Sequence, residues 1–63
     1  MKKIFNKIKT DAEYMAQGFE PWEVPYARKH DELFNKYQEE DAWNSLTEEQ
    51  WEEYNSLVNL LHI

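Results

Sequence analysis

The fold is decided by the stretch LTEEQW at residues 46–51, the clearest structural instruction in the chain. Thr47 suits an N-cap, because its hydroxyl can accept a hydrogen bond from the backbone N–H of Gln50. The Gln50 side chain can reach back to the N–H of Thr47, which completes a capping box. Leu46 and Trp51 have the spacing of a hydrophobic staple around that cap. The stretch therefore predicts a helix that begins at residue 48.

Beyond the cap, apolar residues recur with the spacing of one helix face as far as about residue 61. That face consists of Trp51, Tyr54, Leu57, Val58, Leu60 and Leu61. Acidic side chains fill the first turn and a half, where the helix dipole favours negative charge. We predict a helix over 48–61, whose apolar face must be covered by the rest of the chain.

The first part of the chain allows two interpretations. Ile4, Ile8, Ala12 and Met15 fall on one helical face, which favours a single helix over about 2–17. Alternatively, Thr10 or Asp11 caps a shorter helix over 11–17 and the preceding chain is extended, because Thr and Asp favour N-caps over helix interiors. We favour the single helix, because its stripe continues across the doubtful point. Gly18 then follows as the left-handed C′ residue.

Residues 19–25, FEPWEVP, form a Pro-containing aromatic linker, because the two prolines exclude a continuous helix. Its aromatic residues either fold back over the core as a lid or, in Trp22, expose an anchor for a partner. Pro25 suits the first turn of a second helix over about 25–43. Asn44 is expected to end that helix in a left-handed conformation, followed by a short turn.

These elements predict an all-α fold, a small three-helix domain that occupies residues 1–63 as one unit. A chain of 63 residues is too short for a second domain. It has no Cys, so disulfides cannot stabilise it, but it has ten aromatic residues, and large rings suit a small core. If some of these rings do not fit inside, a homodimer or a partner surface would cover them.

Charge is distributed unevenly along the chain, whose net charge is −6. Four lysines make the first nine residues basic, and residues 37–63 carry seven acids and no Lys or Arg. An acidic chain is repelled by phosphate backbones. Helices two and three resemble a helix-turn-helix in their spacing, but the front of the second would present glutamates to DNA, so direct nucleic-acid binding is disfavoured.

The sequence gives little support to catalysis, metals or cofactors. His30 and His62 have no ligand spacing, and phosphate cradles need more than the one glycine present. His30 lies on an apolar stripe and is predicted to be a half-buried core residue bonded to a carbonyl. Paired carboxylates occur only on faces predicted to be solvated. We expect a protein that is not an enzyme, with no metal and no cofactor.

The remaining class is protein binding. We predict a small acidic, non-enzymatic module of the cytoplasm, with no membrane segment or signal peptide, that docks on a larger protein with a basic surface. Its concrete form is an inhibitor or adaptor, of the kind that phages and mobile elements encode, which occludes a basic or nucleic-acid-binding surface. The alternative is an assembly subunit that homodimerises through its aromatic surface, and the third is a divergent helix-turn-helix protein. The residues predicted to bind the partner are Glu39, Glu40, Asp41, Glu48, Glu49, Glu52 and Glu53, with Trp22 and Trp43 as aromatic anchors.

Overall fold

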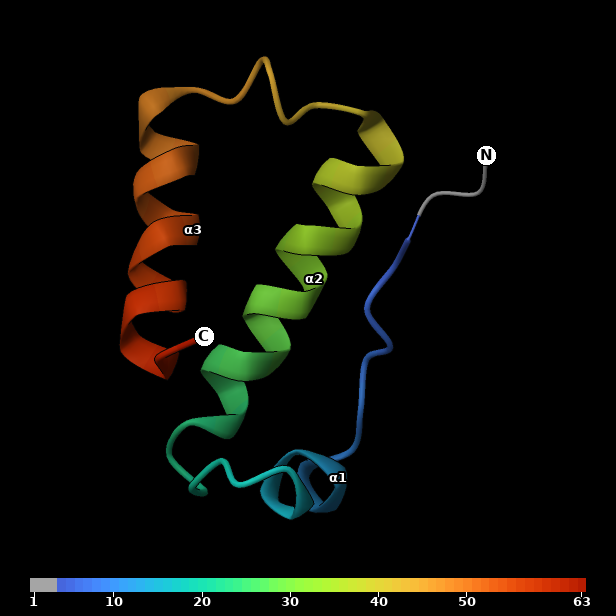
Figure 1. The fold of residues 1–63 in the computed structure, drawn as a ribbon, viewed down its shortest axis with the longest axis vertical. Helices are drawn as coiled ribbons and strands as arrows, with labels where there is room; N and C mark the ends of the chain where they lie inside the picture. Colours follow the sequence, from blue (N-terminus) through green and yellow to red (C-terminus); the bar gives the residue numbers. More distant parts are fainter. Residues whose placement is uncertain (1–3) are drawn as a thin grey trace.

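Three helices make up the fold of residues 4–63, which are the residues that this computed structural model describes. They are α1 at Asp11–Ala16, α2 at Val24–Glu40 and α3 at Glu48–Leu61. Helix α2 runs through the middle of the molecule, α3 packs beside it, and α1 lies across its foot (Figure 1). No strand is present in this part of the chain. The predicted all-α class is confirmed.

Helix α3 begins at the residue that its cap predicts. The hydroxyl of Thr47 accepts from the N–H of Gln50 at 3.2 Å, and the side chain of Gln50 accepts from the N–H of Thr47 at 2.8 Å. Thr47 itself has extended backbone angles, as an N-cap residue should. The helix ends at Leu61, where His62 takes a left-handed conformation. Its predicted bounds of 48–61 are therefore confirmed.

The predicted single helix over 2–17 is wrong in its first half. A second capping box, between Thr10 and Glu13, starts α1 at Asp11, as the alternative interpretation expected. Residues 4–10 are not helical, and residues 2 and 3 lie outside the described part of the chain. The apolar stripe that favoured the longer helix is not a core face, because Ile4 is 72 % exposed and Ile8 and Met15 are each 42 % exposed. The buried residue of α1 is Tyr14.

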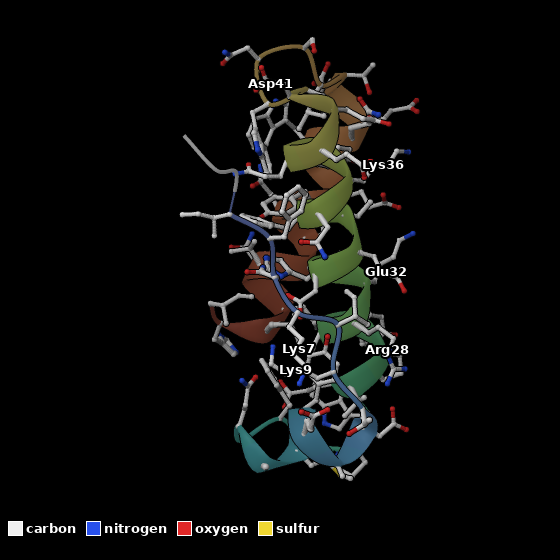
Figure 2. All side chains as sticks on the ribbon, turned by 90° about the vertical axis from the view of Figure 1, so that its right-hand side faces the viewer. Lys7, Lys9, Arg28, Glu32, Lys36 and Asp41 are labelled. Carbon is white, nitrogen blue, oxygen red and sulfur yellow. The ribbon has the colours of Figure 1, made fainter. Side chains whose placement is uncertain are left out.

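Residues 4–10 lie along α2 on the side away from α3 (Figures 1 and 2). Asn6 and Asn35 hold this segment through two hydrogen bonds of 2.7 Å. The backbone N–H of Asn6 donates to the side-chain oxygen of Asn35, and the Asn35 amide donates to the backbone oxygen of Asn6. A side-chain amide thus replaces the helical bonds that the sequence predicted here.

The linker divides its aromatic residues between core and surface. Gly18 has a φ of 108° after α1, a conformation that residues with a Cβ avoid. Phe19 packs against the core and Val24 is buried, so this part of the linker forms the expected lid. Trp22 remains 53 % exposed and is not part of that lid.

Helix α2 ends three residues earlier than predicted. Asp41, and not Asn44, takes the left-handed position, with a φ of 52° and its N–H bonded to the carbonyl of Gln38. Aspartate tolerates this conformation because its short polar side chain interacts locally. Trp43 therefore belongs to the connection between α2 and α3, where the helical register does not fix its direction.

The core consists of two small clusters stacked along α2. One, at the foot of the molecule, contains Tyr14, Val24, Ala27 and Leu61. The other joins α2 to α3 and contains Leu33, Tyr37 and Leu57, with Trp43, Leu46 and Tyr54 packed against it. The smallest extent of the molecule is 14 Å, little more than the diameter of one helix, so α2 and α3 form a single layer. None of the helices described is long and apolar enough to cross a membrane.

Candidate functional site

The fold gathers the two predicted acidic runs at one end of the α2–α3 pair. The first run closes α2 and the second opens α3, so the connection between the helices brings them together (Figure 1). All seven side chains are exposed. We call this group the acidic end; its members are Glu39, Glu40, Asp41, Glu48, Glu49, Glu52 and Glu53.

Two of these carboxylates, one from each helix, act on the same buried phenol. Burial raises the pKa of Tyr37, and the negative charges of Glu53 and Glu40 raise it further. Tyr37 is almost completely buried between α2 and α3. Because both carboxylates affect the pKa of Tyr37, Glu40 of α2 and Glu53 of α3 lie near the same part of the interface between the two helices.

Among the described residues, Lys7, Lys9 and Arg28 lie away from this end, whereas Lys36 lies near it, about one helical turn before Glu40 on α2 (Figure 2). Lys7 and Lys9 stand on the N-terminal segment and Arg28 near the foot of α2, whereas Asp41 lies at the opposite end of the helix (Figure 2). Lys7 pairs with Glu13, and Arg28 pairs with Asp11. Because residues 37–63 contain no Lys or Arg, α3 and the connection before it contribute no positive side chain.

Four half-buried or exposed rings lie beside the acidic end, and we call them the aromatic platform: Phe34, Trp43, Trp51 and Tyr54. The Trp43 ring lies between the others, with its centroid 5.4 Å from Tyr54, 5.6 Å from Phe34 and 6.1 Å from Trp51. Trp51 is the most exposed ring, at 38 %. The indole N–H of Trp43 donates to the side-chain oxygen of Gln38 at 2.7 Å, so the chain itself uses the polar edge of that ring.

Sequence reasoning placed these rings differently. Trp51 and Tyr54 were assigned to the covered face of α3, yet Trp51 reaches the surface. Trp43 was predicted as a partner anchor; it is half-buried and sits in the centre of the platform. The available signal was the density of rings near residues 43–54, which is high for so short a stretch.

Trp22 does not join the other predicted site residues. It lies in the linker before α2, whereas the acidic end is at the other end of that helix. Its ring packs edge-on against Tyr26 at 6.4 Å, and its indole N–H donates to Glu20. The structure therefore brings Trp43 together with the acids and separates Trp22 from them.

A buried polar group that the sequence did not reveal lies where the N-terminal segment, α1 and α2 meet. We call it the Asp31 cluster; its members are Asp31, Asn6, Lys9, Tyr14 and His30. One carboxylate oxygen accepts from the Tyr14 hydroxyl at 2.7 Å and lies 3.9 Å from the Lys9 ammonium. The other accepts from the Asn6 amide and contacts Nδ1 of His30, both at 3.2 Å.

Tyr14 holds its hydroxyl proton more tightly within the Asp31 cluster than a free tyrosine does. Burial, and then the hydrogen bond to Asp31, raise the pKa of Tyr14 to about 12. His30 is buried, as its apolar position predicted, but the expected carbonyl partner is wrong, because the contact is to the Asp31 carboxylate. No pattern in the sequence indicated this cluster, because Asn6 and Lys9 come from residues 4–10, which were predicted to be helical and are not.

The Asp31 cluster borders an open cavity of about 240 Å³ whose other walls include Gln17, Phe19, Ala27 and Ile63. That volume lies below the 300 Å³ or more of typical small-molecule sites. Both Asp31 oxygens already have partners within the chain, so the cluster serves to join the elements around it. No group of three or more His, Asp or Glu residues among positions 4–63 is placed to hold a metal ion.

Comparisons with protein-family models, curated proteins and solved structures found no match. Among the chain's own surfaces, the acidic end with its aromatic platform is the most distinctive.

Proposed function

We propose that this protein is a non-enzymatic binding module that docks through its acidic end on a basic surface of a larger protein. One observation carries the proposal. Folding brings two separate acidic runs to the same end of the α2–α3 pair, beside half-exposed aromatic rings. Rings of this kind dominate the energetics of protein interfaces, and the carboxylates would supply attraction over a longer range.

The charge pattern supports an electrostatic role for this end. The seven carboxylates outnumber Lys36, the cation that precedes them on α2, and create a negative field that attracts basic surfaces. Where such a surface binds nucleic acid, the carboxylates would occupy positions that phosphates otherwise take. The module would then act as an inhibitor or adaptor of the phage or mobile-element type.

A second candidate function is self-assembly through the opposite end of α2. Trp22 and Tyr26 are 53 % and 45 % exposed and pack against each other there. Such a pair would be covered in a homodimer, and the acids would then serve only solubility.

The test is capture of partners from a lysate of the native host at low and high salt, quantified by mass spectrometry. The test variant replaces Glu49, Glu52 and Glu53 by Gln, which removes charge and keeps the side-chain shape. A control with the same loss of charge replaces Glu20, Glu23 and Glu32 by Gln. We expect the control to retain a salt-eluted partner that the test variant loses.

Equal recovery of that partner by both variants would refute the electrostatic role of the acidic end. Circular dichroism must show the same helix content for both variants and the wild type. Recovery of this chain alone, together with a dimer mass in solution, would favour self-assembly. A Trp22→Ser variant should then be monomeric.

A further inference from the structure

Among residues 4–63, no Lys or Arg lies over a ring of the aromatic platform, in contrast to the ring of Tyr14. The ammonium of Lys9 lies 5.3 Å from the centroid of the Tyr14 ring, and the guanidinium carbon of Arg28 lies 5.7 Å from it. Among the described residues these are the cation–π contacts of the protein, and both involve Tyr14. The recorded neighbours of the platform rings are other rings, which include His30 and Tyr37.

Trp43 is suited to stacking more than to hydrogen bonding, and Trp51 beside it offers an exposed ring. Trp51 is exposed at the surface of α3, and Gln38 already engages the indole N–H of Trp43. Glu48 precedes Trp51 by one helical turn, so the two side chains share a helix face. A group that binds here meets a ring face and a carboxylate together.

We propose that the partner presents arginine side chains that stack on Trp51 and the neighbouring Trp43 while their guanidinium groups pair with carboxylates such as Glu48. This inference rests on the proposed function and specifies its partner. The planar guanidinium stacks on rings and donates to a carboxylate through the same flat group. A lysine ammonium is more strongly hydrated and cannot stack, so it gains only the electrostatic attraction.

The negative charge of the acidic end favours an arginine-bearing partner on the aromatic platform over a second copy of the chain. Two copies meeting at their platforms would bring both acidic ends together, and in each copy seven carboxylates outnumber the nearby Lys36. Like charges at an interface oppose association. An arginine-bearing segment neutralises that charge as it covers the rings.

The experiment titrates the full chain with three peptides of equal length, in which alternate positions are all Arg, all Lys or all Gln. Calorimetry and tryptophan fluorescence report binding at low and moderate salt. We expect the Arg peptide to bind roughly three- to tenfold more tightly than the Lys peptide and the Gln peptide not to bind. Trp51→Leu should remove most of the preference for Arg, and Trp22→Leu should leave it unchanged.

Trp51→Phe provides a second variant in case the leucine variant does not fold, and it should retain an intermediate preference because phenylalanine keeps a weaker π face. Equal affinity for the Arg and Lys peptides, with no effect of Trp51→Leu, would overturn the inference. If that equal binding is also lost on neutralising Glu49, Glu52 and Glu53, the proposed function still stands. If neither the Arg nor the Lys peptide binds, the inference is also overturned. The proposed function is then tested by the lysate capture alone.

Discussion

Raising the pH should destabilise this protein, and Tyr14 is the side chain for which the loss can be worked out. Its hydroxyl is buried and donates to Asp31, and its pKa is raised to about 12 from an ordinary value of 10. The folded protein therefore holds this proton more tightly than the unfolded chain does. This difference contributes to the free energy of unfolding. The contribution is fully present below about pH 10 and is lost as the pH rises from there through 12.

The magnitude follows from the shift. Two pKa units at about 1.4 kcal/mol each correspond to about 3 kcal/mol of stability, of which half should be lost by about pH 11. A 63-residue protein has a total stability of only about 3–9 kcal/mol. Tyr37 and Tyr54, whose pKa values are also raised by burial, add losses in the same direction. Unfolding should therefore begin well before pH 12.

The Tyr14→Phe variant isolates this contribution, because every other titrating group is common to both proteins. At pH 7 the variant should be less stable by about 1.5–3 kcal/mol, since it loses a hydrogen bond to a carboxylate. Between about pH 9 and 11.5 the wild type should lose stability faster, so the two curves converge. Tyr26→Phe controls for removal of an exposed hydroxyl and should change stability at pH 7 by less than about 0.5 kcal/mol.

The assay is urea denaturation followed by far-ultraviolet circular dichroism at each pH. Parallel curves for wild type and Tyr14→Phe over that range would refute the reasoning, because Tyr14 would then bind its proton equally in the folded and unfolded states. If Tyr14→Phe is as stable as the wild type at pH 7, the hydrogen bond from Tyr14 to Asp31 does not stabilise the fold.

Three further changes test the local structure by denaturation or hydrogen exchange. Thr47→Ala should lower the free energy of unfolding by about 0.5–2 kcal/mol, whereas Thr47→Ser, which keeps the cap, should retain most of it. Asn35→Ala should speed hydrogen exchange at the Asn6 amide by roughly tenfold or more, because two hydrogen bonds of 2.7 Å are lost, and an unchanged rate would contradict the proposed attachment. Gly18→Ala should cost about 1–3 kcal/mol through its φ of 108° alone, since nothing lies within 4 Å of the added methyl group.

The sequence predicted α3 well because two independent local signals agree there. The capping box at Thr47 and the apolar stripe indicate the same first residue, and both depend on neighbours within one helix. At the N-terminal part of the chain the same two signals disagree. The stripe through Ile4 and Ile8 favoured a long helix, the cap at Thr10 favoured a short one, and the cap was correct.

The reason is that a cap satisfies specific backbone groups, whereas a stripe is useful only if another element covers it. Helix α2 instead offers Asn35 to the N-terminal segment, and one amide side chain binds both backbone groups of Asn6. No periodic pattern in the sequence reveals such a contact, because it joins residues 29 positions apart. The Asp31 cluster was missed for the same reason, since Asn6 and Tyr14 reach the carboxylate only once that segment is in place.

The acids of the candidate site could be predicted because they stand in the sequence as two runs, and the short connection between α2 and α3 brings these runs together. The direction of Trp43 could not be predicted, since it follows an unexpected helix end at Asp41.

His30 connects the two functional regions of this small layer. Its ring stacks on Tyr54 at 5.1 Å and on Phe34 at 6.5 Å, while its Nδ1 contacts Asp31. The aromatic platform is thus supported from beneath by a residue that the polar cluster orients. Trp43 and Tyr54 also pack against the cluster of Leu33, Tyr37 and Leu57, but His30 is the contact by which changes in the Asp31 cluster should reach the proposed binding surface. His30 and Asp31, the buried polar residues of the described chain, should therefore affect the proposed binding surface without contacting the proposed partner.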